Sequence, residues 1–307
     1  MDVVHAAYSL PARRGDATAW AVAQGRPELG DALLAAGCAH YHYVLDETMI
    51  GLGSDAIERV LAESGTTARQ VDALCVFHTS PCATLPTPYA LAGELRAACG
   101  LDRAWSFAIG QQHCVSAVHA LRVLDALFAR NRHWRRALLV GIDVILSEPL
   151  RAIGASALHS DAASATLLGR DGEGARVLAI ETFNDPVQSL GIDADGRYID
   201  NANYLWSLIS VLRRVFKAGR ASPDAIGSVL PHNVNRRAWS QALGALRISE
   251  DKLFDRNFAR IGHAFGSDAA INIADSGVLA AQGRHLVFAS GIGGTFGGFL
   301  LETGSCQ

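Results

Sequence analysis

Strand-like and helix-like patterns alternate along this chain, and that alternation restricts the fold more than any other feature. Apolar runs predict strands over 72–80, 104–110, 136–146, 163–170, 175–183, 227–232 and 285–302, the last as a pair. Apolar positions three or four residues apart predict helices over 54–64, 87–99, 116–131, 204–219, 236–246 and 269–283. Ser54 is the expected N-cap of the first helix. Strands separated by helices indicate an α/β fold with a mostly parallel sheet.

The second part of the chain repeats the rhythm of the first. A turn-rich stretch, GRDGEG at 169–174, lies between the two parts. We therefore expect two packed α/β halves, residues 1–170 and 171–307, rather than two independent domains.

Composition excludes several classes of protein. With 50% hydrophobic and 19% charged residues among 307, the chain can bury a large core. A net charge of −3 and the absence of lysine-rich runs argue against a nucleic-acid partner. No apolar run reaches the roughly 20 residues of a membrane helix, and the N-terminus lacks a signal-peptide layout. Six scattered cysteines do not form a disulfide framework. We expect a soluble cytoplasmic protein with reduced thiols and no membrane partner.

Cys114 is the cysteine most suited to chemistry. The stretch IGQQHCVSAVHAL, residues 109–121, connects a predicted strand to a predicted helix, so Cys114 lies at or just before a helix N-terminus. Unpaired N–H groups and the helix dipole favour a thiolate there, and the same N–H groups could hold an oxyanion. The alternative is a buried structural thiol, which is our interpretation of Cys38, Cys75 and Cys99.

Two histidines lie where a base would be expected. His232 ends an apolar strand in SVLPHNVN, and His263 lies in the glycine-flanked turn RIGHAFGSD. The cluster CAHYHY at 38–43 lacks a fourth ligand and zinc spacing, so we expect no metal site. The glycine-rich GIGGTFGG at 291–298 lies between strands and lacks a P-loop lysine, so no nucleotide cofactor is expected.

Six segments, in order, resemble the β-ketoacyl-acyl-carrier-protein synthase III family of the thiolase-like superfamily. They are LPTPYALAGELRAACGL, FAIGQQHCVSAVHAL, ALLVGIDVIL, HSDAASATLL, VLPHNVNRR and SGIGGTFGGFLLE, and together they span nearly the whole chain. The resemblance implies a thiolase-like α/β fold of two duplicated halves packed as five layers, α-β-α-β-α. It also implies an acyltransferase that works through an acyl-cysteine.

The resemblance assigns roles to residues of this chain. Cys114 becomes the acylated nucleophile, and His232 a histidine that helps activate the acceptor. Backbone N–H groups of Cys114 and Ile292 form the oxyanion hole, where Gly293 keeps the loop tight. Substrate or carrier contacts fall on Asn235 and Arg237. His113 is a further candidate substrate contact, or it caps the turn.

Departures from the family pattern leave two chemistries open. GHAFGSDAA stands where initiating synthases have an asparagine motif, so His263 takes that place, and Asp268 either orients an imidazole or replaces it. A Cys–His–His set suits decarboxylative Claisen condensation in specialised biosynthesis of polyketide or fatty-acid type, which is our first expectation. A Cys–His–Asp set suits acyl transfer to a hydroxyl or amine by general base catalysis.

The resemblance also indicates partners. The donor is a thioester of an acyl carrier protein or of coenzyme A, and the second substrate is a malonyl-type extender or a small acceptor. AAGCAHYHYVLDETMIG lacks the family's coenzyme A motif, which favours a carrier-bound donor. A homodimer is expected, as in the relatives. The competing class is a non-catalytic partner subunit, which retention of Cys114 and His232 disfavours.

Overall fold

The computed structural model describes residues 1–79, 90–170, 172–186, 199 and 201–304. Its main feature is a nine-stranded sheet in the order β11-β12-β13-β10-β1-β9-β6-β4-β5. The strands of this sheet are β1 Asp2–Ser9, β4 Ala73–Phe77, β5 Trp105–Ile109, β6 Arg136–Asp143, β9 Ala162–Gly169, β10 Ala175–Asn184, β11 Ile226–Pro231, β12 Gly283–Gly291 and β13 Thr295–Thr303. The longer helices are α3 Met49–Ser64, α4 Leu91–Ala98, α5 Ser116–Arg130, α6 Tyr204–Ala218, α7 Arg236–Leu246 and α9 Asp268–Ser276.

The two parts of the sheet follow the same plan. In the first part β1 pairs antiparallel with β9, β9 antiparallel with β6, and β6 parallel with β4. In the second part β10, β13, β12 and β11 repeat these pairings in the same order and sense. A short antiparallel ladder of two residue pairs between β1 and β10 joins the parts. The duplicated arrangement expected from the sequence is confirmed.

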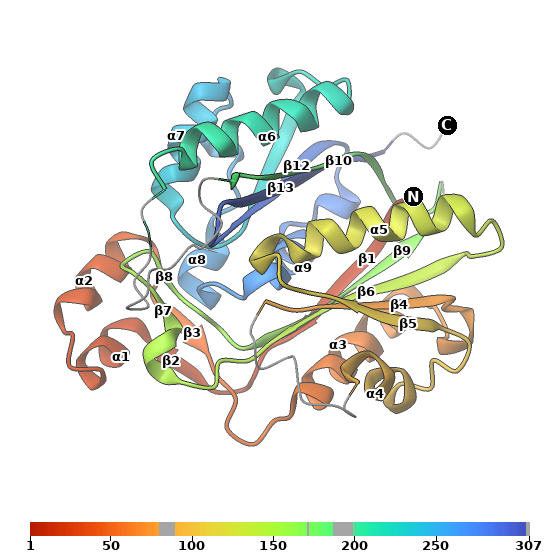
Figure 1. The fold of residues 1–307 in the computed structure, drawn as a ribbon, viewed down its shortest axis with the longest axis horizontal. Coiled ribbons are helices and arrows are strands. Elements are labelled where there is room, and N and C mark those ends of the chain that lie inside the picture. The colour runs from red at the N-terminus through yellow and green to blue at the C-terminus, as the bar shows by residue number, and fades with distance from the viewer. Residues whose placement is uncertain (80–89, 171, 187–198, 200, 305–307) are drawn as a thin grey trace.

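The core confirms the five layers. One apolar cluster lies between the helices α3 and α4 and the first part of the sheet, and another between α6, α7 and the second part. A third cluster joins α5 and α9 to strands of both parts. Figure 1 shows α3 and α4 on one outer side, α6 and α7 on the other, and α5 and α9 in the middle. The two central helices therefore begin deep inside the molecule.

The expectation of a mostly parallel sheet is wrong. Only β4–β5, β4–β6 and β11–β12 are parallel, and the other five neighbouring pairs are antiparallel. The reason is the connection between strands. No crossover α-helix separates β6 from β9, and a three-residue turn joins β12 to β13. β9 therefore runs antiparallel to β6, and β13 runs antiparallel to β12.

Two helix boundaries also differ from expectation. Thr48, not Ser54, caps α3, because its side chain accepts a hydrogen bond from the Gly51 N–H and the helix begins at Met49. The helix expected over 269–283 ends at Ser276, where Gly277 takes a φ of 72°. The remaining predicted helices and strands form close to the expected ranges. Residues 85–89 of the LPTPYALAGELRAACGL segment, residue 171 at the join, Cys82 and Cys306 lie outside the described residues.

A small lobe precedes α3 in the chain. It contains helices α1 Ala17–Ala23 and α2 Glu28–Ala35 and the two-stranded sheet of β2 Arg14–Asp16 and β3 His40–His42. The lobe packs against a second ribbon, β7 Ala152–Ile153 with β8 Ala157–Leu158. Among the described residues, none of the helices is long and apolar enough to cross a membrane.

Candidate active site

Cys114 lies in a tight elbow between β5 and α5. The 3-10 turn η3, His113–Val115, leads directly into α5 at Ser116. Gln111 and His113 have φ values of 64° and 50°, so the chain reverses sharply before the helix begins. The cysteine is 7% exposed and lies beside the unpaired N–H end of α5, as the sequence predicted.

A second elbow in the duplicated half faces the first. The 3-10 turn η8, Phe265–Ser267, precedes α9 and again starts from a positive φ, 55° at Phe265. The two elbows are in contact, and a Cβ on Gly266 would lie 3.2 Å from the Cys114 carbonyl oxygen. The fold duplication therefore brings the start of α5 and the start of α9 together.

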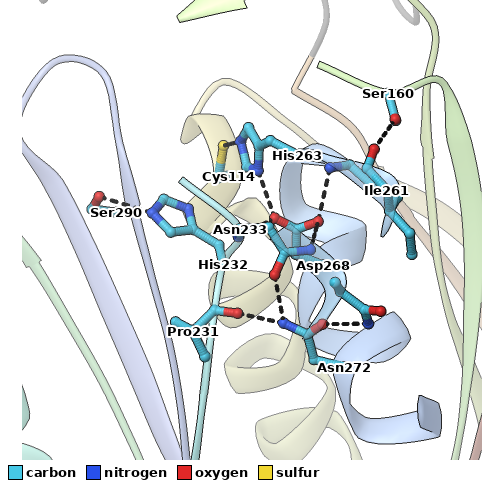
Figure 2. Close-up of polar contacts among 12 residues, drawn as sticks. Cys114, Ser160, Pro231, His232, Asn233, Ile261, His263, Asp268, Asn272 and Ser290 are labelled. Carbon is cyan, nitrogen blue, oxygen red and sulfur yellow. Dashed lines mark hydrogen bonds and ion pairs between the residues drawn. The ribbon is translucent and has the colours of Figure 1, made fainter. Parts of the chain in front are cut away.

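Three side chains from these elbows form one line. The Cys114 Sγ lies 3.2 Å from Nε2 of His263, and Nδ1 of His263 lies 2.5 Å from Oδ2 of Asp268. Figure 2 shows the His263 ring between the thiol and the carboxylate. Of the two alternatives left open by the sequence, the geometry has Asp268 orienting an imidazole rather than replacing it.

Asp268 is held by donors on both oxygens. Oδ2 accepts from the Asn233 backbone N–H at 2.6 Å, and Oδ1 accepts from the Ala264 N–H at 2.8 Å and the Asn233 side-chain amide at 3.1 Å. The residue is fully buried and lies in the first turn of α9, where the helix dipole also favours negative charge. A buried carboxylate with this many donors is satisfied as an anion.

The charge on His263 follows from its neighbours. Burial by itself lowers the pKa of the imidazole, but Asp268 and Cys114 together outweigh burial and raise this pKa to about 10. The ring is therefore an imidazolium at neutral pH, paired with Asp268 on one side and facing the sulfur on the other. A cationic imidazole facing a sulfur is the arrangement that activates cysteine nucleophiles in other enzymes.

His232 lies beside this line but has different partners. It follows β11, and its ring is 5.2 Å from the His263 ring. Its Nε2 lies 3.3 Å from the Ser290 Oγ, and Nδ1 has no hydrogen-bond partner among the described residues. Burial, with the charge of His263, holds the pKa of His232 well below 6.5, so this imidazole is neutral.

A cavity of about 380 Å³ opens onto these groups, a size suited to a small-molecule substrate. Cys114, His232 and His263 line it. The other predicted residues His113, Asn235, Ile292 and Gly293 also line it. Arg237 does not; it lies exposed on the first turn of α7, two residues beyond Asn235.

The other thiols described fit the structural interpretation. Burial raises the pKa of Cys38 to about 11 and that of Cys75 to about 12. Burial also raises the pKa of Cys99. Cys38 accepts a hydrogen bond from the Leu158 N–H, and neither it nor its neighbours in CAHYHY form a ligand cluster among the described residues. Within the same part of the chain, Cys114, His232 and His263 are the one set whose possible ligand atoms lie within 4.8 Å of one another.

Sequence reasoning missed several polar residues of the site. Asn233 fixes Asp268, Ser290 and Tyr204 extend the contact of His232, and His159 stacks on Phe265 at 3.9 Å in the cavity wall. The asparagine inside PHNVN and the serine before GIGG were the available signals, since both flank segments already singled out.

Comparisons with known proteins agree with this fold. No protein-family model matches the chain. The β-ketoacyl-acyl-carrier-protein synthase III of Acidiphilium cryptum (strain JF-5) is 31% identical over 290 residues, covering 83% of this chain and 84% of that protein. The solved 3-oxoacyl-(acyl carrier protein) synthase III of Pseudomonas aeruginosa PAO1 superposes with a TM-score of 0.83 at 21% identity, covering 98% of each chain. The structure of ChlB3, named an acyltransferase, superposes with a TM-score of 0.82 at 17% identity, covering 98% of this chain and 97% of that one.

The solved structures share the thiolase-like fold, and the curated relative shares sequence over most of both chains. This likeness in sequence shows that the chain belongs to the β-ketoacyl-acyl-carrier-protein synthase III family of acyltransferases.

Proposed function

We propose that this protein transfers an acyl group from a thioester to a hydroxyl or amine of a small acceptor, through an acyl-Cys114 intermediate. The observation that carries the proposal is the Asp268 carboxylate behind Nδ1 of His263. The same fold includes proteins named synthases and a protein named an acyltransferase, so the fold alone does not choose the reaction.

The first half-reaction makes the acyl-enzyme. The Cys114 thiolate attacks the thioester carbonyl carbon, the C–S bond to the carrier breaks, and the leaving thiolate takes the proton from Nε2 of His263. The backbone N–H groups of Cys114 and Ile292 are the proposed oxyanion donors, and each such donor contributes about 3 kcal/mol in well-studied acyl transfers. Gly293, with a φ of 82°, allows the tight turn that carries the second donor.

The second half-reaction needs a base. As the acceptor oxygen or nitrogen attacks the acyl carbon, its proton passes to Nε2 of the now neutral His263, and the Cys114 thiolate leaves. Asp268 stabilises the imidazolium that forms, so the starting charges are restored. Decarboxylative condensation generates its carbanion by loss of CO₂ and needs no such base, and an anion beside the site disfavours the enolate.

Condensation remains the second candidate because of His232. This neutral ring and His263 both lie near Cys114, as donors to a malonyl carbonyl would. The test is intact-mass analysis of wild type and Cys114→Ala with a panel of acyl thioesters, followed by a chase. Discharge to alcohols or amines supports the proposal. Discharge only to a malonyl thioester, with CO₂ release, contradicts it, and no adduct at all favours a partner subunit.

We propose an acyl carrier protein as the donor, with Arg237 as a docking contact. This exposed guanidinium lies two residues from Asn235, which lines the cavity. The acidic surface of a carrier would meet it near the entrance. Arg237→Glu should slow acylation from a carrier-bound donor and leave acylation from an N-acetylcysteamine thioester unchanged; equal slowing with both donors would contradict the assignment.

We propose that the protein works as a homodimer. β5 is an edge strand, and Trp105 on it is 53% exposed, an arrangement that favours pairing with a second copy. Light scattering should give twice the 32.5 kDa chain mass, and Trp105→Lys should shift it toward the monomer. A monomeric wild type would contradict this.

A further inference from the structure

Behind the active site, four hydrogen bonds join Asp268 to the protein surface. Arg260 Nε donates to Asn257 Oδ1 at 3.0 Å, and Asn257 Nδ2 donates to Asn272 Oδ1 at 2.8 Å. Asn272 Nδ2 donates to Asn233 Oδ1 at 3.0 Å, and Asn233 Nδ2 donates to Asp268 Oδ1 at 3.1 Å. We call Asn257, Asn272 and Asn233 the amide relay. Figure 2 shows its inner end, from Asn272 through Asn233 to Asp268.

The direction of the relay is fixed by groups that can play only one role. The Asn272 amide nitrogen also donates to the Pro231 carbonyl at 2.6 Å, and a carbonyl can only accept. At the outer end Arg260 can only donate, and at the inner end the ionised Asp268 can only accept. A flip of any one amide would place two acceptors or two donors face to face.

The relay is buried and carries charge at both ends. Its three asparagines are at most 1% exposed, whereas the Arg260 side chain is 45% exposed and also binds Asp275 and Tyr8. Amide dipoles aligned in one direction polarise one another in a low-dielectric interior. Donors to a carboxylate favour its charged form, and a charged Asp268 keeps the proton on His263.

We propose that Arg260 is a positioning residue, which acts through the amide relay to hold the Asp268 carboxylate, and hence the His263 imidazolium, in place behind Cys114. This rests on the proposed function for the role of His263 as a base. The other titratable groups facing the His263–Asp268 pair are Cys114 from η3, His232 after β11 and His159 between β8 and β9. None of them touches the relay's outer end.

The test compares Arg260→Gln and Arg260→Lys with Arg256→Gln. Arg256 is an exposed arginine of the same helix, α8 Arg256–Ile261, and lies outside the relay. The first readout is the pH profile of Cys114 alkylation by iodoacetamide, which reacts with the thiolate and needs neither donor nor acceptor. The second is kcat and KM for acyl transfer, with thermal unfolding recorded for every variant.

We expect Arg260→Gln to slow alkylation near pH 6 by about three- to tenfold, the size of one ordinary hydrogen bond, with little change near pH 9.5. Transfer kcat should fall similarly at unchanged KM, Arg260→Lys should recover part of the loss, and Arg256→Gln should match wild type. Alkylation of Arg260→Gln that matches Arg256→Gln at every pH overturns the proposal, even if its melting temperature falls. Because alkylation involves no substrate, failure of acyl transfer alone would contradict only the proposed function.

Discussion

The ion pair of His263 and Asp268 determines the chemistry available at the level of single residues. His263 is 1% exposed, so solvent screens the pair little, and its imidazolium form is favoured because Asp268 and Cys114 outweigh burial and raise its pKa. The pKa of His263 in the folded protein lies above 6.5, the ordinary value for a histidine. The pair's contribution to stability is therefore fully present below pH 6.5 and is lost as pH rises toward the folded pKa, about 10 in the intact site.

This sign can be measured in a Cys114→Ala background, which removes the thiol that contacts His263. The free energy of unfolding should fall by up to about 1.4 kcal/mol per pH unit above pH 6.5, over a range shortened by the loss of Cys114. Adding Asp268→Asn should flatten that slope. Urea unfolding from pH 6 to 9.5 gives the comparison, and equal slopes in the two variants would contradict the ion pair.

At the scale of elements, the position of His263 depends on how α8 ends. Gly262 follows the helix with a φ of 74°, and a Cβ there would lie 2.7 Å from the Leu158 carbonyl oxygen and 2.9 Å from that of His40. The backbone of His263 itself bonds to both neighbours of His159, through Leu158 O and the Ser160 N–H. The turn and the ribbon β7–β8 therefore hold the imidazole from behind.

Gly262→Ala should destabilise the protein by about 1–3 kcal/mol, because the backbone must leave its conformation. Alkylation of Cys114 should slow as well, since His263 moves with the turn. Gly244→Ala is the control, because a Cβ in that helix meets nothing within 4 Å, and it should be neutral or slightly stabilising. Urea unfolding measures the free energy of unfolding of both variants. A Gly262→Ala variant as stable as wild type would show that the turn tolerates a side chain.

The helices and strands also separate what the sequence could predict from what it could not. Apolar periodicity predicted the six longer helices and every strand of the nine-stranded sheet except β1, because the core faces follow it. It did not predict β1, α1, α2 or α8. It could not give the sense of strand pairing, which depends on connections, nor the start of α3 at Met49, since Thr48 and Ser54 are both good caps. Sequence reasoning did not find the amide relay for a different reason. Its asparagines carry no charge, and the residues they bond lie 15 to 39 positions apart, so only the fold brings them together.

At the scale of the whole molecule, duplication places two elbows face to face and buries several histidines where they meet. His159 and His232 are 6% and 3% exposed. Burial, with the charge of nearby His263, lowers the pKa of both well below 6.5. The unfolded chain binds protons at these residues below pH 6.5 while the folded chain does not, so stability falls as the pH falls.

His159→Phe should reduce this acid sensitivity while keeping the stacking on Phe265. Between pH 6.5 and 5 the variant should lose up to about 1.4 kcal/mol less per pH unit than wild type, since that is the most that one histidine can contribute. The exposed His133→Phe is the matched control and should follow wild type. If both variants lose stability in parallel with wild type, His159 does not stay neutral in the fold.

The most direct test of the account is the rate at which preformed acyl-Cys114 discharges to an alcohol or amine, in wild type and in Asp268→Asn. Replacing the triad aspartate of a serine protease by asparagine lowers kcat about 10⁴-fold, so we expect discharge here to slow by about 10²-fold or more. Asp255→Asn is the control and should leave discharge unchanged, because Asp255 pairs with Arg236 and does not line the cavity. Equal discharge rates for wild type and Asp268→Asn, or discharge of the wild type to malonyl thioester alone, would contradict the account.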